Sequence, residues 1–404
     1  MRATGLALFA CCGVLARADE PDARLATIEF RVRVPQATPA DANVWISGNA
    51  AAMGRWNPRG LSLKRQPDGL YTAEAKLPIG ERVEFKLNRG GWESVERAAD
   101  GKDTPNRTLT PRESQKLEID VAGWADPKER PQRRSTLTGT IRFHEVDSKV
   151  FGEKRKLAVY LPPGYESQTG TRYPVFYLHD GQNLFDESTA AFGVEWRADE
   201  AAEALIAEKK IRPLIIVGVY NSGARLAEYT PTMAKDYLGS GKGNSHARFL
   251  LEEVKPFVDR TYRTNLDPRQ TAVGGSSLGG LIALDLAWRH PGAFGLCAAV
   301  SPAVWWDADE LRRRFEKDPG GLKTARIWID MGTAEGGAKE KDAKEEGISE
   351  SVTSARRLVE AFEKAGLTKE KSFRYLEVEG GQHNEAAWAA RFPEVLKFLF
   401  PAGE

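Results

Sequence analysis

The sequence predicts two folded domains of different class: a small all-β sandwich, then an α/β domain with a doubly wound, mostly parallel sheet. Three observations support this. Short β-prone runs separated by Gly, Pro, Asn and Asp fill residues 26–122, whereas strands and helices alternate over residues 136–402. Residues 123–135 between them are charged, contain prolines and show no periodicity, which is typical of a linker.

Residues 1–18 have the pattern of a secretory signal peptide. Arg2 precedes an apolar run from Leu6 to Leu15, and Ala18 ends a small-residue cleavage motif. A lipoprotein signal that ends at Cys11 is an alternative, but the apolar run continues beyond that cysteine. We therefore expect a secreted or periplasmic bacterial protein.

The composition is that of a globular protein without a strong charge bias. The 404 residues carry a net charge of +1, which gives no electrostatic reason to expect a nucleic-acid partner. After the signal segment, no stretch is long and apolar enough to span a membrane. Cys297 is the one cysteine beyond that segment, so we expect no internal disulfide and a buried thiol in an apolar strand.

Five strands are predicted in the first domain from alternating or β-branched residues bounded by turn residues. They are residues 28–34, 43–48, 71–75, 83–87 and 115–119. Trp56 and Trp92 fall in loops between strands. A loop tryptophan can stack on the apolar face of a sugar ring, although packing in the core is the alternative.

Several motifs of this domain, in order, resemble those of starch-binding and glycogen-binding carbohydrate-binding modules. They are VWISGN (44–49), MGRW (53–56), LPIG (77–80), VEFKL (83–87), GWES (91–94) and PNR (105–107). The resemblance implies that Trp56 and Trp92 form a sugar platform and that Lys86 and Asn106 supply hydrogen bonds. Tyr71 stands where the family has a structural tryptophan, which implies packing. The implied ligand is an α-glucan, with an inert docking domain as the alternative.

The second domain is predicted to alternate strands and helices. The expected strands are residues 156–161, 173–179, 214–220, 270–273, 295–300, 325–331 and 372–377. The expected helices are residues 199–208, 247–264, 278–289, 350–365 and a terminal helix from 386. Catalytic side chains in such a sheet lie in loops at the carboxyl ends of the strands.

One loop stands out because Gly275-x-Ser277-x-Gly279 lies between a predicted strand and a predicted helix. In that context the pattern predicts a nucleophile elbow, a sharp turn that projects a serine hydroxyl from the sheet. Ser276 is the rival hydroxyl, but centring the motif on it loses the second glycine. We therefore predict Ser277 as the nucleophile.

The strand-end rule also selects the partners of Ser277. His383 follows the last strand and is the expected general base. The acid should follow the preceding strand, where Asp330 lies within the strand and Glu335 in the loop beyond it; we prefer Glu335 because a loop carboxylate can reach the histidine.

An oxyanion hole requires two backbone N–H groups. We expect them from Leu278, the residue after the nucleophile, and from Gln182, with Gly181 as second choice. His179 and Asp180 precede that loop without the spacing of metal ligands, so we interpret them as structural and predict no metal and no organic cofactor.

The second domain resembles the α/β-hydrolase branch that contains enterochelin-type siderophore esterases, feruloyl and acetylxylan esterases and mycolyltransferases. The motifs are YLPPGY (160–165), YPVFYLHDGQN (173–183), RLAEYTP (225–231), GGSSLGG (274–280), SPAVWW (301–306) and GTAE (332–335). They cover about residues 137–400 in order. The resemblance implies an α/β-hydrolase fold and a Ser277–Glu335–His383 triad, and it leaves the substrate open.

Together these observations predict an exported serine carboxylic-ester hydrolase that works through an acyl-enzyme, on an ester of acetyl or feruloyl type linked to a carbohydrate. A siderophore esterase of the enterochelin type, or an acyltransferase, would use the same triad. The alternative outside enzymes is a glycan-binding protein with an inactive hydrolase scaffold, which the presence of all three triad residue types disfavours. The expected partners are the ester substrate and a polysaccharide.

Overall fold

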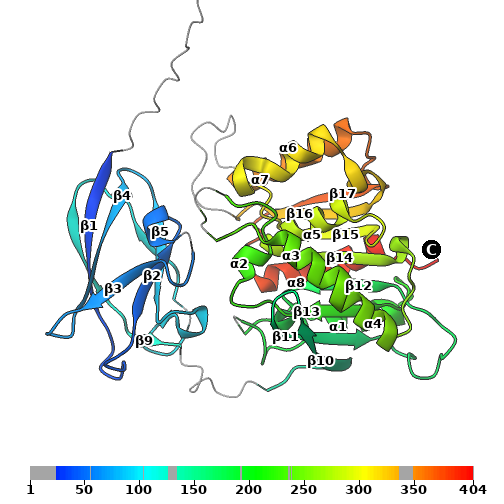
Figure 1. Ribbon diagram of the computed structural model, residues 1–404, viewed down its shortest axis with the longest axis horizontal. Coiled ribbons are helices and arrows are strands. Elements are labelled where there is room, and N and C mark those ends of the chain that lie inside the picture. Colours follow the sequence, from blue (N-terminus) through cyan, green and yellow to red (C-terminus); the bar gives the residue numbers. More distant parts are fainter. Residues whose placement is uncertain are drawn as a thin grey trace, which may run out of the picture. The chain divides into compact units, whose positions relative to one another are not determined.

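The chain forms two compact units, residues 1–127 and 128–404, and each is described by itself (Figure 1). The computed structural model describes residues 24–54, 56–102, 104–125, 134–191, 193–234, 237, 239–335 and 349–403. The predicted signal peptide and most of the predicted linker lie outside the described residues.

The first unit is built from one curved sheet with the strand order β7-β5-β2-β3-β4-β1-β8, and from a short pair, β6 and β9, in its described part. Neighbouring strands are antiparallel, except that β1 runs parallel to β8. The strands are β1 (Leu25–Arg33), β2 (Val44–Gly48), β3 (Leu61–Arg65), β4 (Tyr71–Pro78), β5 (Val83–Asn88), β6 (Glu96–Arg97), β7 (Arg107–Leu109), β8 (Gln115–Asp120) and β9 (Gly123–Trp124). This arrangement is the predicted β-sandwich.

The core of this unit follows from side-chain alternation. Every second residue of β1, from Ala26 to Val32, is at most 1% exposed, because successive side chains of a strand point to opposite faces. Tyr71 is buried and donates its hydroxyl to the Ala42 carbonyl at 2.9 Å, which fits the expected packing role. Strand β3 was not predicted, because Leu61–Arg65 contains no β-branched or aromatic residue.

The second unit contains an eight-stranded sheet with the order β10-β11-β13-β12-β14-β15-β16-β17. Strands β10 and β11 are antiparallel to their neighbours, and all strands from β13 to β17 are parallel. The strands are β10 (Thr140–Ser148), β11 (Glu153–Leu161), β12 (Val175–His179), β13 (Ile215–Val219), β14 (Thr271–Ser276), β15 (Leu296–Val300), β16 (Arg326–Gly332) and β17 (Phe373–Val378). The predicted mostly parallel, doubly wound sheet is confirmed.

Helices cover both faces of this sheet and bury two separate apolar cores (Figure 1). Helices α1 and α8 pack on one face, while α4, α5, α6 and α7 pack on the other. The longer helices are α1 (Ala198–Ala207), α3 (Gly243–Arg248), α4 (Lys255–Thr261), α5 (Leu278–Arg289), α6 (Trp306–Lys317), α7 (Glu350–Lys364) and α8 (Glu385–Leu399). Cys297 is buried in β15, where a thiol was expected to pack.

Some elements of this unit differ from the predictions. The helix expected over 247–264 begins earlier, at Gly243, and ends at Thr261, with a π-helical segment (η4, Phe249–Val254) between α3 and α4. Strand β10 was not predicted, because it is an edge strand whose side chains are mostly exposed or half-buried. Helix α6 was not predicted, because charged residues dominate it and few apolar residues mark its period.

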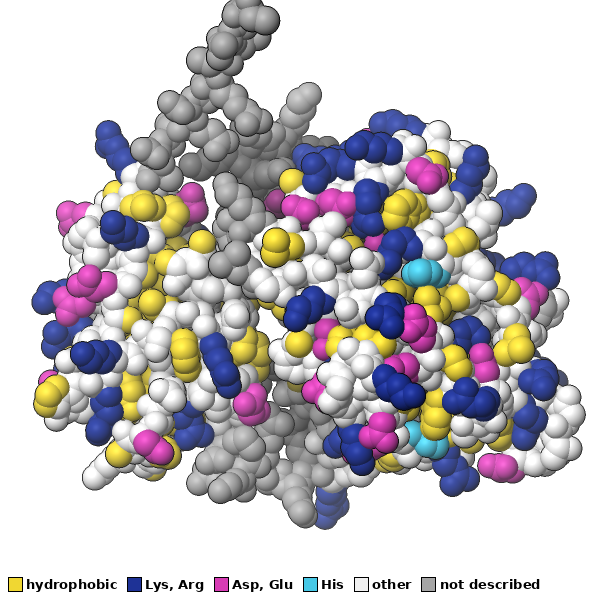
Figure 2. All heavy atoms as spheres, in the orientation of Figure 1, with side chains coloured by type: hydrophobic (Ala, Val, Ile, Leu, Met, Phe, Trp, Pro, Cys, Tyr) yellow, Lys and Arg dark blue, Asp and Glu magenta, His cyan; other side chains and the backbone are white. Residues whose placement is uncertain are grey.

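The described surface carries both signs of charge. On the face drawn in Figure 2, acidic and basic side chains are interspersed over both units. Within the described ranges, no helix is long and apolar enough to cross a membrane.

Candidate functional sites

Ser277 occupies a sharp turn between β14 and α5. Its backbone lies at φ 56° and ψ −121°, a sparsely populated conformation for a residue with a side chain. The flanking glycines are required by close packing: a Cβ on Gly275 would lie 3.0 Å from the backbone of Gly279 and from His179 Cβ. The turn therefore has the strand–turn–helix geometry of a nucleophile elbow.

His383 lies in the loop after β17 and contacts the carboxylate of Glu335 from the loop after β16. His383 Nδ1 is 2.8 Å from Glu335 Oε2. Because an ionised carboxylate only accepts hydrogen bonds, Nδ1 carries the proton and Nε2 is left as the acceptor. The imidazole is 42% exposed and packs edge-on against Trp388 at a centroid distance of 4.9 Å. Among the described residues, no hydrogen bond joins His383 to the Ser277 hydroxyl.

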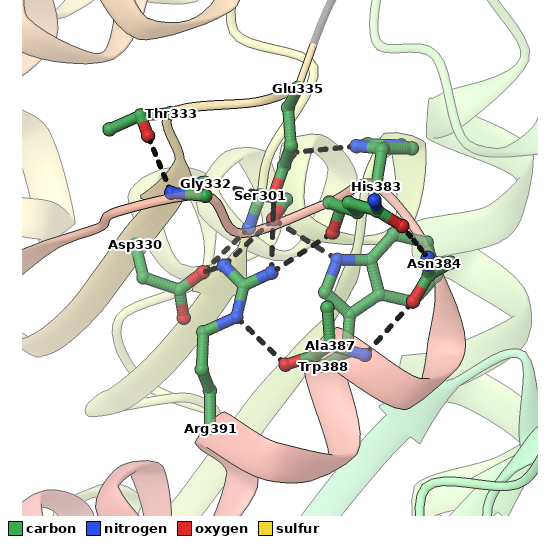
Figure 3. A network of polar contacts seen from close by, with 12 residues as sticks. Ser301, Asp330, Gly332, Thr333, Glu335, His383, Asn384, Ala387, Trp388 and Arg391 are labelled. Carbon is green, nitrogen blue, oxygen red and sulfur yellow. Dashed lines mark hydrogen bonds and ion pairs between the residues drawn. The ribbon is translucent and has the colours of Figure 1, made fainter.

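The second oxygen of Glu335 is held by three donors (Figure 3). Oε1 accepts from Ser301 Oγ at 2.6 Å, from the Gly332 amide at 2.9 Å and from Arg391 Nη2 at 3.1 Å. Burial alone would raise the pKa of Glu335, but the bonds from His383 and Ser301 and the charge of Arg391 lower it. The carboxylate is therefore held ionised, with Oε2 directed at the imidazole.

Asp330, the other candidate acid, binds Nη1 of the Arg391 guanidinium, whereas Glu335 binds Nη2 (Figure 3). Among the described residues, no hydrogen bond or ion pair joins Asp330 to His383. Its carboxylate is fully buried, pairs with Arg391 Nη1, and accepts from Trp328 Nε1 at 2.6 Å. Burial outweighs the charge of Arg391 and raises the pKa of Asp330 to about 6. Asp330 is thus part of the support beneath the Glu335–His383 pair.

Ser301, Trp388 and Arg391 complete this support and were not identified from the sequence. Ser301 Oγ also accepts from Trp388 Nε1 and from Arg391 Nη1, both at 3.1 Å. The available signal was Arg391, which lies on the apolar face of the terminal helix. Because a guanidinium is rarely buried without an acidic partner, its position indicates a buried carboxylate nearby.

The expected oxyanion donors follow adjacent strands. Strands β12 and β14 are parallel, with Leu178 opposite Gly274, so the loops after them lie at the same edge of the sheet. Leu278 is the first residue of α5, where backbone N–H groups have no partner within the helix. Gln182 lies in a 3₁₀ turn (η3, Gly181–Asn183) after β12, and Thr189 Oγ1 donates to its carbonyl at 2.7 Å.

His179 lies beneath the elbow and pairs with a second buried histidine. Its Nδ1 is 2.7 Å from the Gly274 carbonyl and therefore carries a hydrogen, so Nε2 accepts from His246 Nε2 at 3.1 Å. Burial lowers the pKa of His179 to about 4 and the pKa of His246 well below its usual value. Asp180 pairs with Arg225 at 2.7 Å, so these side chains brace the loop.

In the first unit, the structure brings Trp56 and Trp92 together. Their rings are 6.3 Å apart between centroids, inclined at 43°, and both side chains are half-buried. Lys86 Nζ donates to the Thr104 carbonyl, and Asn106 Nδ2 donates to Glu84 Oε2 at 3.2 Å.

A buried polar pair links the two tryptophan loops. Asn88 Oδ1 accepts from the Gly90 amide at 2.7 Å, in the loop before Trp92. Asn88 Nδ2 donates to Ser47 Oγ at 3.0 Å, and Ser47 Oγ donates to the carbonyl of Asn57, next to Trp56. Because Asn88 and Ser47 are fully buried, this link fixes the spacing of the loops.

An elbow serine and a carboxylate-bound histidine at the strand ends of a doubly wound sheet define the serine hydrolase class. The family model described as "Putative esterase" matches residues 148–399, and the chain belongs to that family. It is a carboxylic ester hydrolase. The family model of the starch binding domain matches residues 25–119.

Curated relatives match each part of the chain. An endo-1,4-beta-xylanase/feruloyl esterase of Xylanibacter ruminicola is 27% identical over 271 residues, which are 66% of this chain and 32% of that protein. Ferri-bacillibactin esterase BesA of Bacillus subtilis is 30% identical over 180 residues, 41% of this chain and 59% of its own. An alpha-amylase of Niallia circulans is 43% identical over 101 residues, 25% of this chain and 8% of the amylase.

Among solved structures, an IroE-like serine hydrolase from Shewanella oneidensis matches with a TM-score of 0.51 at 21% identity. The match covers 65% of this chain and 80% of that chain. This similarity supports the α/β fold of the second unit.

Proposed function

We propose that the protein is an exported serine esterase that cleaves an ester of acetyl or feruloyl type on a carbohydrate. The observation that carries this proposal is the presence of a starch binding domain and an esterase domain in one chain. The relative from Xylanibacter ruminicola, named as a xylanase and feruloyl esterase, supports the substrate class. The pattern of residues 1–18, which lie outside the described residues, supports export.

In the proposed mechanism, Ser277 Oγ attacks the ester carbonyl while His383 Nε2 takes the serine proton. Glu335 accepts the hydrogen bond from His383 Nδ1, which fixes the tautomer and stabilises the imidazolium. The proton then passes to the leaving alcohol, and the acyl group stays on Ser277. Water, deprotonated by His383, releases the acid.

We assign the stabilisation of the negative charge on the carbonyl oxygen to two backbone donors, the N–H groups of Leu278 and Gln182. Donors fixed before the reaction need no reorganisation when the charge develops, and each such donor contributes about 3–4 kcal/mol to transition-state stabilisation in comparable enzymes. The positive N-terminal end of α5 adds to this field.

The first unit is assigned to α-glucan binding. Trp56 and Trp92 would stack on the apolar faces of glucose rings, while Lys86 and Asn106 would hydrogen-bond the sugar hydroxyls. The inclined, half-buried ring pair supports this assignment, because two stacking surfaces inclined to each other fit a coiled polymer better than they fit a flat polymer.

The experiment is acid release from acetylated starch, acetylated xylan, a feruloylated oligosaccharide, a catecholate siderophore and a small activated ester. The Ser277→Ala protein is the blank. We expect a carbohydrate ester to give the highest kcat/KM. Preference for the siderophore would instead favour the second candidate, a siderophore esterase, which is supported by the 30% identity to BesA.

Acyl transfer to a sugar or lipid would use the same residues and differs only in the group that attacks the acyl-enzyme. Adding a glucose oligomer at rising concentration to the same assay separates the two outcomes. A hydrolase releases free acid in proportion to ester consumed, whereas a transferase forms an acylated oligomer at the expense of free acid.

A further inference from the structure

Three carboxylates that take no part in the proposed reaction lie together where α1 begins. Glu195 precedes the helix, and Asp199 and Glu200 are in its first turn. One oxygen atom from each lies within 4.8 Å of those of the other two. Glu195 is 3% exposed and Asp199 is fully buried, so water has little access to the centre of the group.

Each carboxylate is held in place through one oxygen, which leaves the other for a ligand. Glu195 Oε1 accepts from Thr136 Oγ1 at 2.5 Å. Asp199 Oδ2 accepts from the amides of Thr138 and Gly139 at 3.1 and 3.0 Å, and from Thr138 Oγ1 at 3.0 Å. Glu200 Oε1 accepts from Arg197 Nε at 3.3 Å. These bonds orient the carboxylates without reaching the oxygens on their other side.

Those remaining oxygens have no partner. Glu195 Oε2, Asp199 Oδ1 and Glu200 Oε2 are inaccessible to solvent and accept no hydrogen bond from any described residue. A buried carboxylate oxygen without a donor is costly, and three in one place require a positive group between them. Arg197 is the one described base that forms an ion pair with the group, and its side chain is 69% exposed.

Two positive partners are possible, a proton or a metal ion. A proton on one carboxylate can serve at most two of the oxygen atoms. Here one oxygen from each of three neighbouring carboxylates is buried without a partner. A cation would satisfy all three oxygens at once.

We propose that Glu195, Asp199 and Glu200 bind a calcium ion. Oxygen-only donors select a hard cation. Calcium accepts several carboxylates in a flexible geometry, whereas magnesium requires near-ideal octahedral geometry and usually binds through one or two carboxylates. The three oxygen atoms lie within 4.8 Å of one another, so one ion can contact them all.

The site joins segments that matter to the second unit. It ties residues 136–139, which lead into β10, to the start of α1. The adjacent backbone also holds the loop that carries Gln182: the Trp196 amide donates to the Asn183 carbonyl at 2.8 Å, and the Ala198 amide donates to the Leu184 carbonyl at 2.9 Å. Calcium would accordingly stabilise residues 136–139, which lead into β10, and the backbone that holds the loop carrying Gln182.

The test uses the full chain, stripped with a chelator and then titrated with calcium chloride at pH 8. We expect one calcium bound per chain by calorimetry. At about 100 times Kd, the esterase-unit unfolding temperature should rise by about 5 °C or more. Magnesium chloride should give a smaller shift. Absence of both calcium binding and a thermal shift in the wild type would overturn the proposal.

Matched variants separate the site from general effects of charge. The double variant Glu195→Gln, Glu200→Gln should lose the calcium response, and its metal-free form should unfold no lower than the metal-free wild type, because it removes repulsion. Glu208→Gln, at the exposed end of the same helix, should respond like the wild type. An equal calcium shift in the double variant would place the ion elsewhere and overturn the assignment.

A spectroscopic readout covers the case in which the double variant does not fold. Terbium(III) occupies calcium sites, and Trp196, adjacent to Glu195, can sensitise its luminescence. We expect terbium emission on excitation of tryptophan in the wild type and its displacement by calcium. The single variant Glu200→Gln should weaken calcium competition at least tenfold, and unchanged competition would contradict the proposal.

Discussion

The two units of this chain hold their functional side chains in opposite ways. In the esterase unit, Glu335 is buried, three donors hold its Oε1, and its Oε2 accepts from His383. In the unit that matches the starch binding domain model, Trp56 and Trp92 lie half-buried on loops that the buried pair Asn88 and Ser47 links. Catalysis needs fixed geometry around a developing charge, whereas binding a polymer needs an exposed apolar surface.

This difference implies that the two proposed activities can be lost separately. Substitutions beneath His383 should change chemical rate, and substitutions on the tryptophan loops should change affinity for the polymer. The predictions below test that separation from the largest expected effect to the smallest.

Ser277→Ala should lower the rate of hydrolysis of a small activated ester by about 10⁴-fold or more, because no acyl-enzyme can form. Retardation in amylopectin gels should be unchanged. The matched control is Ser276→Ala, which removes the neighbouring hydroxyl and should keep most of the activity. A larger loss in the control than in Ser277→Ala would reassign the nucleophile.

Glu335→Gln and Asp330→Asn should separate the acid of the triad from its support. Glu335→Gln removes the acceptor for His383 Nδ1, so we expect kcat to fall by about 10³–10⁴-fold. Asp330→Asn leaves the charge of Arg391 less compensated, so we expect about 3 kcal/mol of lost stability and less than tenfold loss of kcat. Initial rates and calorimetric unfolding of both variants test this, and a larger kcat loss in Asp330→Asn would reverse the assignment.

Acid should destabilise the esterase unit selectively, since all five histidines lie in it. Burial lowers the pKa of His246 well below 6.5 and that of His179 to about 4. Below pH 6.5 the unfolded chain therefore binds protons that the folded unit does not. The free energy of unfolding decreases as the pH is lowered, until the pH reaches the pKa values of the folded state. The predicted window is pH 6.5 to about 4.

The variant His246→Gln keeps a donor for His179 Nε2 and removes one of these titrations. Groups common to both proteins cancel in the difference between variant and wild type. We expect the variant to lose about 2–4 °C less in unfolding temperature between pH 7.5 and pH 5, from up to ~2 kcal/mol of linkage. Equal acid shifts in the two proteins would show that His246 is protonated in the fold.

Much of the fold could be predicted because each signal was local. The apolar run at 173–179 predicts a buried strand through its hydrophobicity, and the glycine pattern around Ser277 predicts the elbow through backbone sterics. Helix α6 and strand β10 could not be predicted, because few apolar residues mark the period of α6 and because the side chains of the edge strand β10 are mostly exposed or half-buried.

The residues proposed to be catalytic could be selected from the sequence, but the residues that support them could not. His383 and Glu335 follow predicted strands, so topology alone brings them to one edge. Arg391 reaches both Asp330 and Glu335 only because α8 folds back against β16, a tertiary contact that no local pattern encodes. The carboxylates of Glu195 and Asp199 likewise come close to each other only because the chain before α1 turns into the first turn of that helix.

The smallest predicted effect concerns the tryptophan loops. Trp56→Ala should weaken binding to amylopectin by about tenfold, about 1.4 kcal/mol, because half of the proposed stacking surface is lost. The kcat/KM for a small soluble ester should stay within twofold of the wild type, and hydrolysis of acetylated starch should fall at low polymer concentration only. Affinity electrophoresis and initial rates measure these quantities, with Trp124→Phe, a residue of β9, as the control. If Trp56→Ala bound amylopectin as the wild type does, the paired rings would be a packing feature, and the separation between a rigid catalytic site and an exposed binding surface would fail on the binding side.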